Sequence, residues 1–179
     1  DREVQSEYTL VISVKDEAGL AGYCKVLVTV EDKNDNPPRF TRLFSVNVTE
    51  NAPIGTMVIQ VTSSDKDAGV FAQATYSFIE PSNMFEIEPN TGEVFVIGNL
   101  DREVKDEYLL MVSANDKSWK AQTTLTVSIL DENDNSPMFE KDRYEFRCKI
   151  SSKTDTLGQV RAKDIDKGHN SMISYTFKH

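Results

Sequence analysis

The sequence predicts an all-β protein made of tandem Greek-key β-sandwiches of immunoglobulin type, each with seven strands. Its middle part contains seven short segments in which apolar and polar residues alternate, and turn sequences separate them. No segment has a sustained apolar stripe with the 3.6-residue period of a helix. A run of acidic and amide residues also occurs twice, at residues 32–40 and, ninety-nine positions later, at residues 131–139.

The alternation defines each expected strand in turn. In the first, Phe44, Val46 and Val48 alternate with polar neighbours, which is the two-residue period of a half-buried strand. The turn sequences include Ala-Pro-Ile-Gly at 52–55 and Pro-Asn-Thr-Gly at 89–92. The Cys…Trp…Cys pattern of antibody domains is absent. The seven strands are expected near residues 44–48, 58–61, 76–78, 85–87, 94–97, 108–114 and 125–129.

Other short motifs repeat with the same period as the acidic run. Asp-Arg-Glu occurs at 1–3 and at 101–103, and an Asp-x-Asp-x-Gly loop occurs at 65–69 and at 164–168. A period near one hundred residues, with several motifs in register, indicates duplicated domains rather than a short solenoid repeat. We expect a segment of a longer protein that holds the end of one unit (1–36), a complete unit (37–135) and the start of a third (136–179).

Composition excludes several functional classes. The 179 residues are 39% hydrophobic, enough for packed cores, and the net charge of −9 argues against a nucleic-acid partner. No apolar run reaches the ~18 residues of a membrane-spanning helix, and the given residues do not open with the basic-then-apolar pattern of a signal segment. With two histidines, no phosphate-binding glycine loop and no nucleophile set, an enzyme is not expected. A glycosidase needs its carboxylate pair once, in a cleft, whereas these acids recur at each unit boundary.

The acidic runs have the composition of a calcium site. Each places carboxylate and amide oxygens in succession before a proline and an aromatic residue, a poor sequence for either a strand or a helix. Ca²⁺ binds six to eight oxygens from carboxylates, amides and main-chain carbonyls. The runs therefore predict divalent-cation sites at the ends of the units.

Five short motifs follow one another in a fixed order. They are Val-x-Glu-Asn (48–51), Asp-x-Asp-x-Gly (65–69), Leu-Asp-Arg-Glu (100–103), Ala-x-Asp (114–116) and Asp-x-Asn-Asp-Asn-x-Pro (131–137). This ordered set resembles the extracellular repeat of the cadherin superfamily, as found in long protocadherin-like or Fat/Dachsous-like arrays. The resemblance extends over the whole chain and implies calcium-binding linkers between β-sandwiches, with up to three Ca²⁺ at each boundary.

The resemblance assigns metal ligands to both boundaries. At the first, the set is Asp1, Glu3, Asp32, Asn34, Asp35, Asp65, Asp67 and Asp116, with main-chain groups at Lys33, Asn36 and Phe71. At the second, it is Glu50, Asp101, Glu103, Asp131, Asn133, Asp134, Asp164 and Asp166, with main-chain groups at Glu132, Asn135 and Asn170. Neither set is complete within the chain, because one ligand of each falls outside residues 1–179. Arg2 and Arg102 are expected to pair with local acids rather than to bind metal.

Two positions depart from the family pattern. Phe71 stands where the family has asparagine, so only its carbonyl is available as a ligand, whereas the third unit keeps Asn170. Residues 148–153 contain no glutamate at the position that matches Glu50. A junction beyond the third unit is therefore predicted to be partly calcium-free and bent.

The resemblance implies a segment of a calcium-dependent cell–cell adhesion or recognition ectodomain, on the extracellular face of the plasma membrane, with the membrane anchor outside this segment. The implied partners are other cadherin ectodomains, in homophilic or heterophilic pairs. Bound calcium would turn a flexible chain of domains into a rod. Alternatively, the complete unit itself makes a lateral or trans protein contact, for which the apolar residues Val70, Phe71 and Ala72 are the local candidate.

Three further residues carry expectations. Alternation places Cys24 and Cys148 on core-facing positions, as buried free thiols too far apart for a disulfide. Asn47-Val48-Thr49 is an N-glycosylation sequon, and Asn47 is expected to face solvent because Val46 and Val48 face the core.

Overall fold

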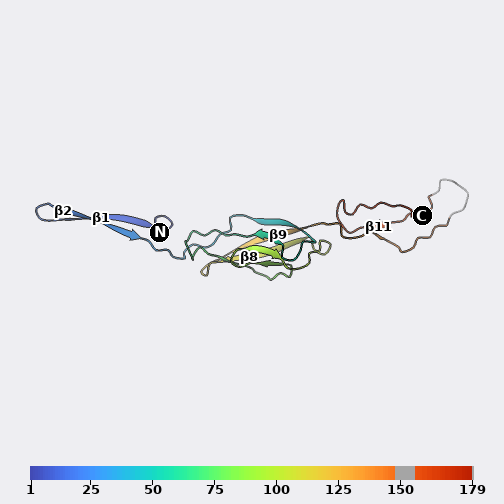
Figure 1. Ribbon diagram of the computed structural model, residues 1–179, viewed down its shortest axis with the longest axis horizontal. Helices are drawn as coiled ribbons and strands as arrows, with labels where there is room; N and C mark the ends of the chain where they lie inside the picture. Colours follow the sequence, from blue (N-terminus) through green and yellow to red (C-terminus); the bar gives the residue numbers. More distant parts are fainter. Residues whose placement is uncertain (148–155, 179) are drawn as a thin grey trace.

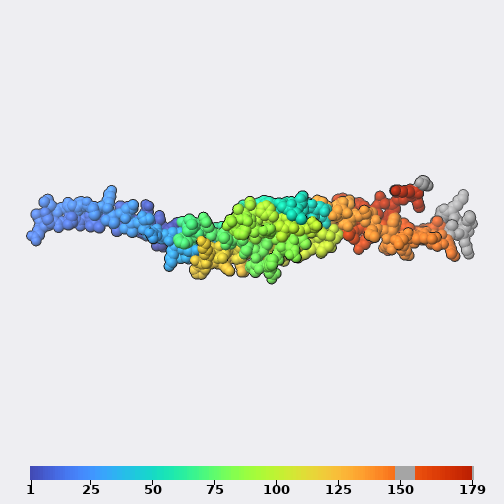
Figure 2. Space-filling view, turned by 60° about the horizontal axis from the view of Figure 1, so that its bottom comes forward, coloured from blue at the N-terminus to red at the C-terminus, as the bar shows by residue number. Residues whose placement is uncertain are grey.

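The computed structural model describes residues 1–147 and 156–178 as an elongated chain of three parts. Figure 1 shows these parts one after another along the long axis, with the complete unit in the middle, and Figure 2 shows that the middle part is the thickest. The described residues form eleven strands. They contain no helix long and apolar enough to cross a membrane.

The complete unit has the seven strands that the alternation predicts, in two sheets. One sheet has the order β3-β9-β8-β5 and the other β4-β7-β6, and β3 pairs with β9 in parallel while the other neighbours are antiparallel. This arrangement confirms the predicted all-β sandwich. The strands are β3 (Phe44–Thr49), β4 (Met57–Gln60), β5 (Thr75–Phe78), β6 (Phe85–Ile87), β7 (Glu93–Val96), β8 (Glu107–Asn115) and β9 (Lys120–Leu130).

The core lies between the two sheets and is built from alternate residues of each strand. Val94 and Val96 of β7 face Val112 of β8 and Leu125 of β9, and all four are fully buried. The rings of Phe85 and Tyr108 pack edge to face, with their centroids 5.2 Å apart. Each fully buried side chain of this kind stabilises the fold by about 1.5–3 kcal/mol. The packed core therefore holds the loops at both ends of the sandwich in fixed positions.

The turn between β6 and β7 shows why the predicted turn sequence ends in glycine. Gly92 has a φ of +71° and donates its N–H to the carbonyl of Glu88 at 2.9 Å. A Cβ atom at this position would lie 2.1 Å from the carbonyl oxygen of Val61. Only glycine fits both the backbone conformation and the close approach of the neighbouring chain.

The flanking parts are smaller. Strands β1 (Glu7–Lys15) and β2 (Ala21–Thr29) form an antiparallel hairpin before the complete unit, and β10 (Met138–Phe139) pairs with β11 (Ala162–Lys163) after it. Cys24 in β2 is a free, exposed thiol. The prediction that it is buried was wrong, because among the described residues no second sheet covers this hairpin, and its residues are exposed on both faces. Cys148 and the other residues of 148–153, with the predictions made for them, lie outside the described residues.

Candidate metal centres at the two junctions

The residues predicted as ligands come together at the two ends of the complete unit, where loops of neighbouring units meet. The first junction joins the turn before β1 and the linker after β2 to the loop after β4 and the β8–β9 turn. The second joins the turn before β8, the start of the loop after β3 and the linker after β9 to the loop after β11. Strand ends thus supply almost every predicted ligand.

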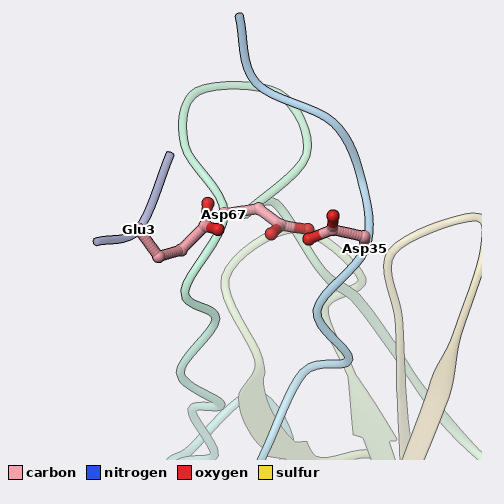
Figure 3. Close-up of side chains that lie close together, drawn as sticks. All are labelled: Glu3, Asp35 and Asp67. Carbon is pink, nitrogen blue, oxygen red and sulfur yellow. The ribbon is translucent and has the colours of Figure 1, made fainter. Parts of the chain in front are cut away.

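At the first junction, carboxylates from both units converge on one position. Oxygen atoms of Glu3, Asp35 and Asp67 lie within 4.8 Å of one another. Figure 3 shows that these side chains approach from three separate segments, with Asp67 between the other two. Glu3 and Asp35 belong to the first unit and Asp67 to the second, so the cluster spans the junction.

Hydrogen bonds of the linker also cross the first junction. The Asn36 side chain donates to Asp67 Oδ1 at 2.6 Å, and its main-chain N–H donates to Oδ2 at 3.2 Å. The N–H of Ala68 donates to Asp32 Oδ2 at 2.8 Å, and Asn34 donates to the carbonyl of Asp116 at 3.1 Å. The linker is therefore bound to two different loops of the second unit.

Asp116 is a carboxylate held in place by its own turn. Its Oδ1 accepts hydrogen bonds from the N–H groups of Ser118 at 2.9 Å and Trp119 at 2.7 Å. Lys117, which lies between Asp116 and Ser118 in the chain, has a φ of +81°. The residue is only 1% exposed, yet Oδ2 has no hydrogen-bond partner. The turn thus directs one free, buried oxygen toward the junction.

At the second junction, Glu50 is the most deeply buried ligand candidate, at 2% exposure. Its two carboxylate oxygens accept hydrogen bonds from the main-chain N–H groups of Arg102 at 2.9 Å and Glu132 at 2.7 Å. Oxygens of Glu50, Glu103 and Asp131 lie within 4.8 Å of one another. This cluster draws on three separate loops of the complete unit.

A second cluster spans this junction. Oxygens of Glu103 and Asp134 lie within 4.8 Å of an oxygen of Asp166, which belongs to the third unit. Asp166 is 5% exposed and accepts a hydrogen bond from Asn135 at 2.9 Å, the same contact that Asn36 makes with Asp67. Glu103 takes part in both clusters, so it is placed to bridge two neighbouring cations.

Asp131 is held in its charged form. Partial burial raises the pKa of its carboxyl, but hydrogen bonds from the Lys167 N–H, the Asn170 side chain and Arg102, together with the charge of Arg102, outweigh burial and lower the pKa below its usual value. Arg102 contacts both Asp131 and Glu103, as expected for an arginine that pairs with local acids. The carboxylate of Asp131 thus remains ionised at neutral pH.

Four of the predicted ligands that lie outside the three clusters of close oxygens each shape their own loop. Asp1 accepts the N–H of Glu3, and Asp101 accepts the N–H of Val104, both at 3.0 Å. Asp65 and Asp164 each accept the N–H of the aspartate two residues later, at 3.0 Å. Each keeps one oxygen free of these turn contacts.

Sequence reasoning gave no role to Asn51, which contacts the linker. Its side chain donates to Glu132 Oε2 at 3.1 Å and to Asp134 Oδ2 at 2.9 Å. Asn51 directly follows Glu50 in the Val-x-Glu-Asn motif, so the motif itself was the available signal. The amide orients two residues of the linker beside the cluster, while Asn133 lies exposed in the same linker.

Buried oxygens without hydrogen-bond partners mark the junctions. Within residues 1–147 and 156–178, the buried side-chain atoms that lack a partner are Asp32 Oδ1, Asn34 Oδ1, Asp65 Oδ2, Asp116 Oδ2 and Asp166 Oδ2. Arg2 Nε lies 3.2 Å from Asp32 Oδ1, but the pair lacks hydrogen-bond geometry. An unpaired buried oxygen is costly unless another group coordinates it. All five belong to predicted ligands, and an oxygen-only donor set suits a hard cation such as Ca²⁺.

Comparisons with known proteins agree with this arrangement. Residues 44–130 match the cadherin domain family. Mouse protocadherin Fat 4 is 38% identical over 99% of the chain, and Drosophila melanogaster protein dachsous is 36% identical over 98%. The chain spans 4% and 6% of the length of these two relatives.

Solved structures show the same fold. Cadherin domains 3–6 of protocadherin gamma-B7 superpose with a TM-score of 0.85 at 26% identity, covering 96% of this chain and 45% of that one. Domains 22–24 of mouse cadherin-23 superpose with a TM-score of 0.78 at 30% identity, covering 96% and 57%.

Proposed function

Because the chain belongs to the cadherin superfamily, with repeats of the protocadherin and Fat type, we propose that it is a segment of a calcium-dependent adhesion or recognition ectodomain. In this proposal, Ca²⁺ bound between repeats makes the array rigid. The units are a repeat that ends at residue 36, a complete repeat over 37–135 and a third that begins at 136. The strand set of the complete unit and the position of the two clusters that span the junctions support these boundaries.

The proposal depends most on one observation: all five partnerless buried oxygens among the described residues are predicted ligands. Folding alone would leave such oxygens facing water or a donor. A cation that accepts their lone pairs explains why they converge. The ligands proposed are the two sets given above, with up to three Ca²⁺ at each junction and the carbonyls of Phe71 and Asn170 completing the loops.

Charge explains how calcium would stiffen the array. Each junction gathers seven carboxylates, and close like charges repel by roughly 1 kcal/mol or more per pair at surface dielectric values. The first junction holds Asp1, Glu3, Asp32, Asp35, Asp65, Asp67 and Asp116, and the second holds Glu50, Asp101, Glu103, Asp131, Asp134, Asp164 and Asp166. Three Ca²⁺ offset six of the seven charges and bond to groups on both sides. Extracellular modules bind Ca²⁺ with a Kd of ~10⁻⁴–10⁻³ M, so millimolar calcium would fill the sites.

Small-angle X-ray scattering tests the stiffening. In calcium at about 2 mM, which is above that range of dissociation constants, the array is expected to give an extended particle with a sharply defined maximum dimension. Addition of EGTA is expected to shorten the mean dimension and broaden the distance distribution, because the repulsion is no longer offset. An unchanged distribution after chelation would contradict the proposal.

A second candidate function is a direct protein contact through the complete repeat. Val70 is 64% exposed and Phe71 is 37% exposed, beside the first junction. Sedimentation of the chain in calcium tests this contact, with Phe71→Asn as the matched variant. Self-association that the variant abolishes supports the contact, and a monomer in both cases removes it.

Asn47 is the proposed glycosylation site. It lies in β3 between half-buried Val46 and buried Val48, and its side chain is exposed, as alternation predicts. A glycan there would project from the outer face of the four-stranded sheet. Mass spectrometry before and after glycosidase treatment of protein from a secreting eukaryotic cell tests occupancy, with Asn47→Gln as the control.

A further inference from the structure

We propose that the two junctions differ in rigidity when calcium is absent. At the second junction, three side-chain contacts, or ties, connect the neighbouring repeats without metal. The first junction lacks these three contacts and becomes the hinge of the segment. The inference rests on the proposed function, because it concerns the same joints. It goes further because it assigns a different stiffness to each junction. The assignment comes from the residues that differ at matching positions of the two junctions.

The first tie is an amide at the loop after the Asp-x-Asp-x-Gly motif. Asp32 and Asp131 occupy matching positions, and the Oδ2 of each accepts one main-chain N–H from the next unit, at 2.8 and 2.9 Å. The Oδ2 of Asp131 also accepts a hydrogen bond from the side chain of Asn170, at 2.9 Å. Phe71 takes the place of Asn170 at the first junction and has no donor. The second junction therefore has one more charge-assisted hydrogen bond between units.

The second tie is an ion pair on the surface. Lys167 Nζ lies 3.2 Å from Asp106 Oδ2, and this pair connects the third unit to the complete unit. The hydrogen bond and charge of Lys167 lower the pKa of Asp106 below its usual value. Ser6 and Ala68 occupy the matching positions at the first junction, so no ion pair can form there. An exposed pair contributes little alone, but here it acts together with the other ties.

The third tie is the arginine of the Asp-Arg-Glu motif. Arg102 is 7% exposed, contacts Asp131 and Glu103, and donates to the carbonyl of Ile165 in the third unit at 3.0 Å. Its guanidinium thus places positive charge among the acids and reaches across the junction. Arg2 at the first junction has a more exposed side chain, 24% against 6%, and its ion pairs stay within its own unit.

Among the described residues, no side chain of the second unit donates a hydrogen bond across the first junction. Its own extra contacts are the Asn36 N–H to Asp67 at 3.2 Å and the Asn34 side chain to the Asp116 carbonyl at 3.1 Å. Both use amides of the linker, and the position that matches Asp116 in the third unit falls beyond residue 179. Within residues 1–147 and 156–178, ion pairs that cross a junction occur only at the second. A charged side chain of the next unit, Lys167, therefore counters the repulsion among the carboxylates at the second junction only.

Pulsed electron paramagnetic resonance on the full chain measures each joint separately. Nitroxide labels at Glu17→Cys and Ser77→Cys span the first junction, and labels at Ser77→Cys and Arg143→Cys span the second. Cys24 and Cys148 are replaced by serine in both proteins. In EGTA, the distance distribution across the first junction is expected to be at least twice as broad as that across the second. Equal widths in EGTA would overturn the inference.

Exchange of the differing residues provides the matched control. Ser6→Asp, Ala68→Lys and Phe71→Asn together are expected to narrow the first distribution in EGTA, and Lys167→Ala with Asn170→Phe is expected to broaden the second. Circular dichroism verifies that each variant is folded. If either set of substitutions leaves the width of its distance distribution in EGTA unchanged, the inference is overturned. If calcium narrows both distributions but their widths in EGTA are equal, only this inference fails. If calcium changes neither distribution, the proposed function fails.

Discussion

Replacement of Glu50 with alanine separates the structural role of a junction carboxylate from its role toward a cation. Glu50 is 2% exposed and accepts the N–H groups of Arg102 and Glu132. Its removal leaves two donors without their acceptor, at about 1–3 kcal/mol for each buried unsatisfied group. In EGTA, the free energy of unfolding is therefore expected to fall by roughly 2–6 kcal/mol.

In the presence of calcium, Glu50→Ala is expected to lose a further part of its stability. Ligand binding stabilises the folded state by RT ln(1 + c/Kd) for each site, where c is the free calcium concentration, so each tenfold loss of affinity removes about 1.4 kcal/mol at saturating calcium. The gain in stability on adding calcium is thus expected to shrink in Glu50→Ala. Thermal melts in EGTA and in calcium measure both parts, with Tm falling by about 4–8 °C per kcal/mol for a domain of this size.

The matched control is Glu86→Ala, on an exposed position of β6. This change is expected to alter stability by less than about 0.5 kcal/mol, with or without calcium. If Glu50→Ala melts like Glu86→Ala in both buffers, the reasoning about the buried carboxylate is refuted.

Three further predictions concern the complete unit and its second junction. Gly92→Ala is expected to lower Tm through both its positive φ and the 2.1 Å approach to a carbonyl, well beyond Gly55→Ala, where φ is also positive but the space is open; equal melting points would contradict this. Leu125→Ala, at a fully buried position, is expected to cost about 2–5 kcal/mol in urea unfolding; a cost below about 1 kcal/mol would show a loosely packed core. Lys167→Ala is expected to raise the pKa of Asp106 toward its usual value in an NMR titration in EGTA. Because the folded pKa is depressed, the contribution of this pair is present at neutral pH and is lost as pH falls through that pKa; an unchanged pKa would contradict the contact.

Local patterns in the sequence were sufficient for the strands of the complete unit. Alternation placed β3, β6 and β8 within a residue or two of their observed bounds, because one face of each strand packs in the core and the other faces solvent. The period of the acidic motifs also placed the candidate ligands at the unit ends. Both signals are short-range and need no knowledge of contacts.

Other features depend on what lies opposite a residue, which alternation does not record. Cys24 alternates like a core residue, yet its face has no opposing sheet within this chain and is exposed. Arg102 was expected to pair locally, and its contact with Ile165 appears only when two units are placed end to end. Asn51 acts through Glu132 and Asp134, which lie more than eighty positions away in sequence.

Isothermal titration calorimetry of an intact pair of repeats with Ca²⁺ shows whether the oxygens of neighbouring repeats bind calcium. The account predicts saturable heat with dissociation constants of ~10⁻⁴–10⁻³ M and a higher melting temperature in calcium than in EGTA. The absence of binding heat up to millimolar Ca²⁺, together with identical melting in both buffers, would contradict it.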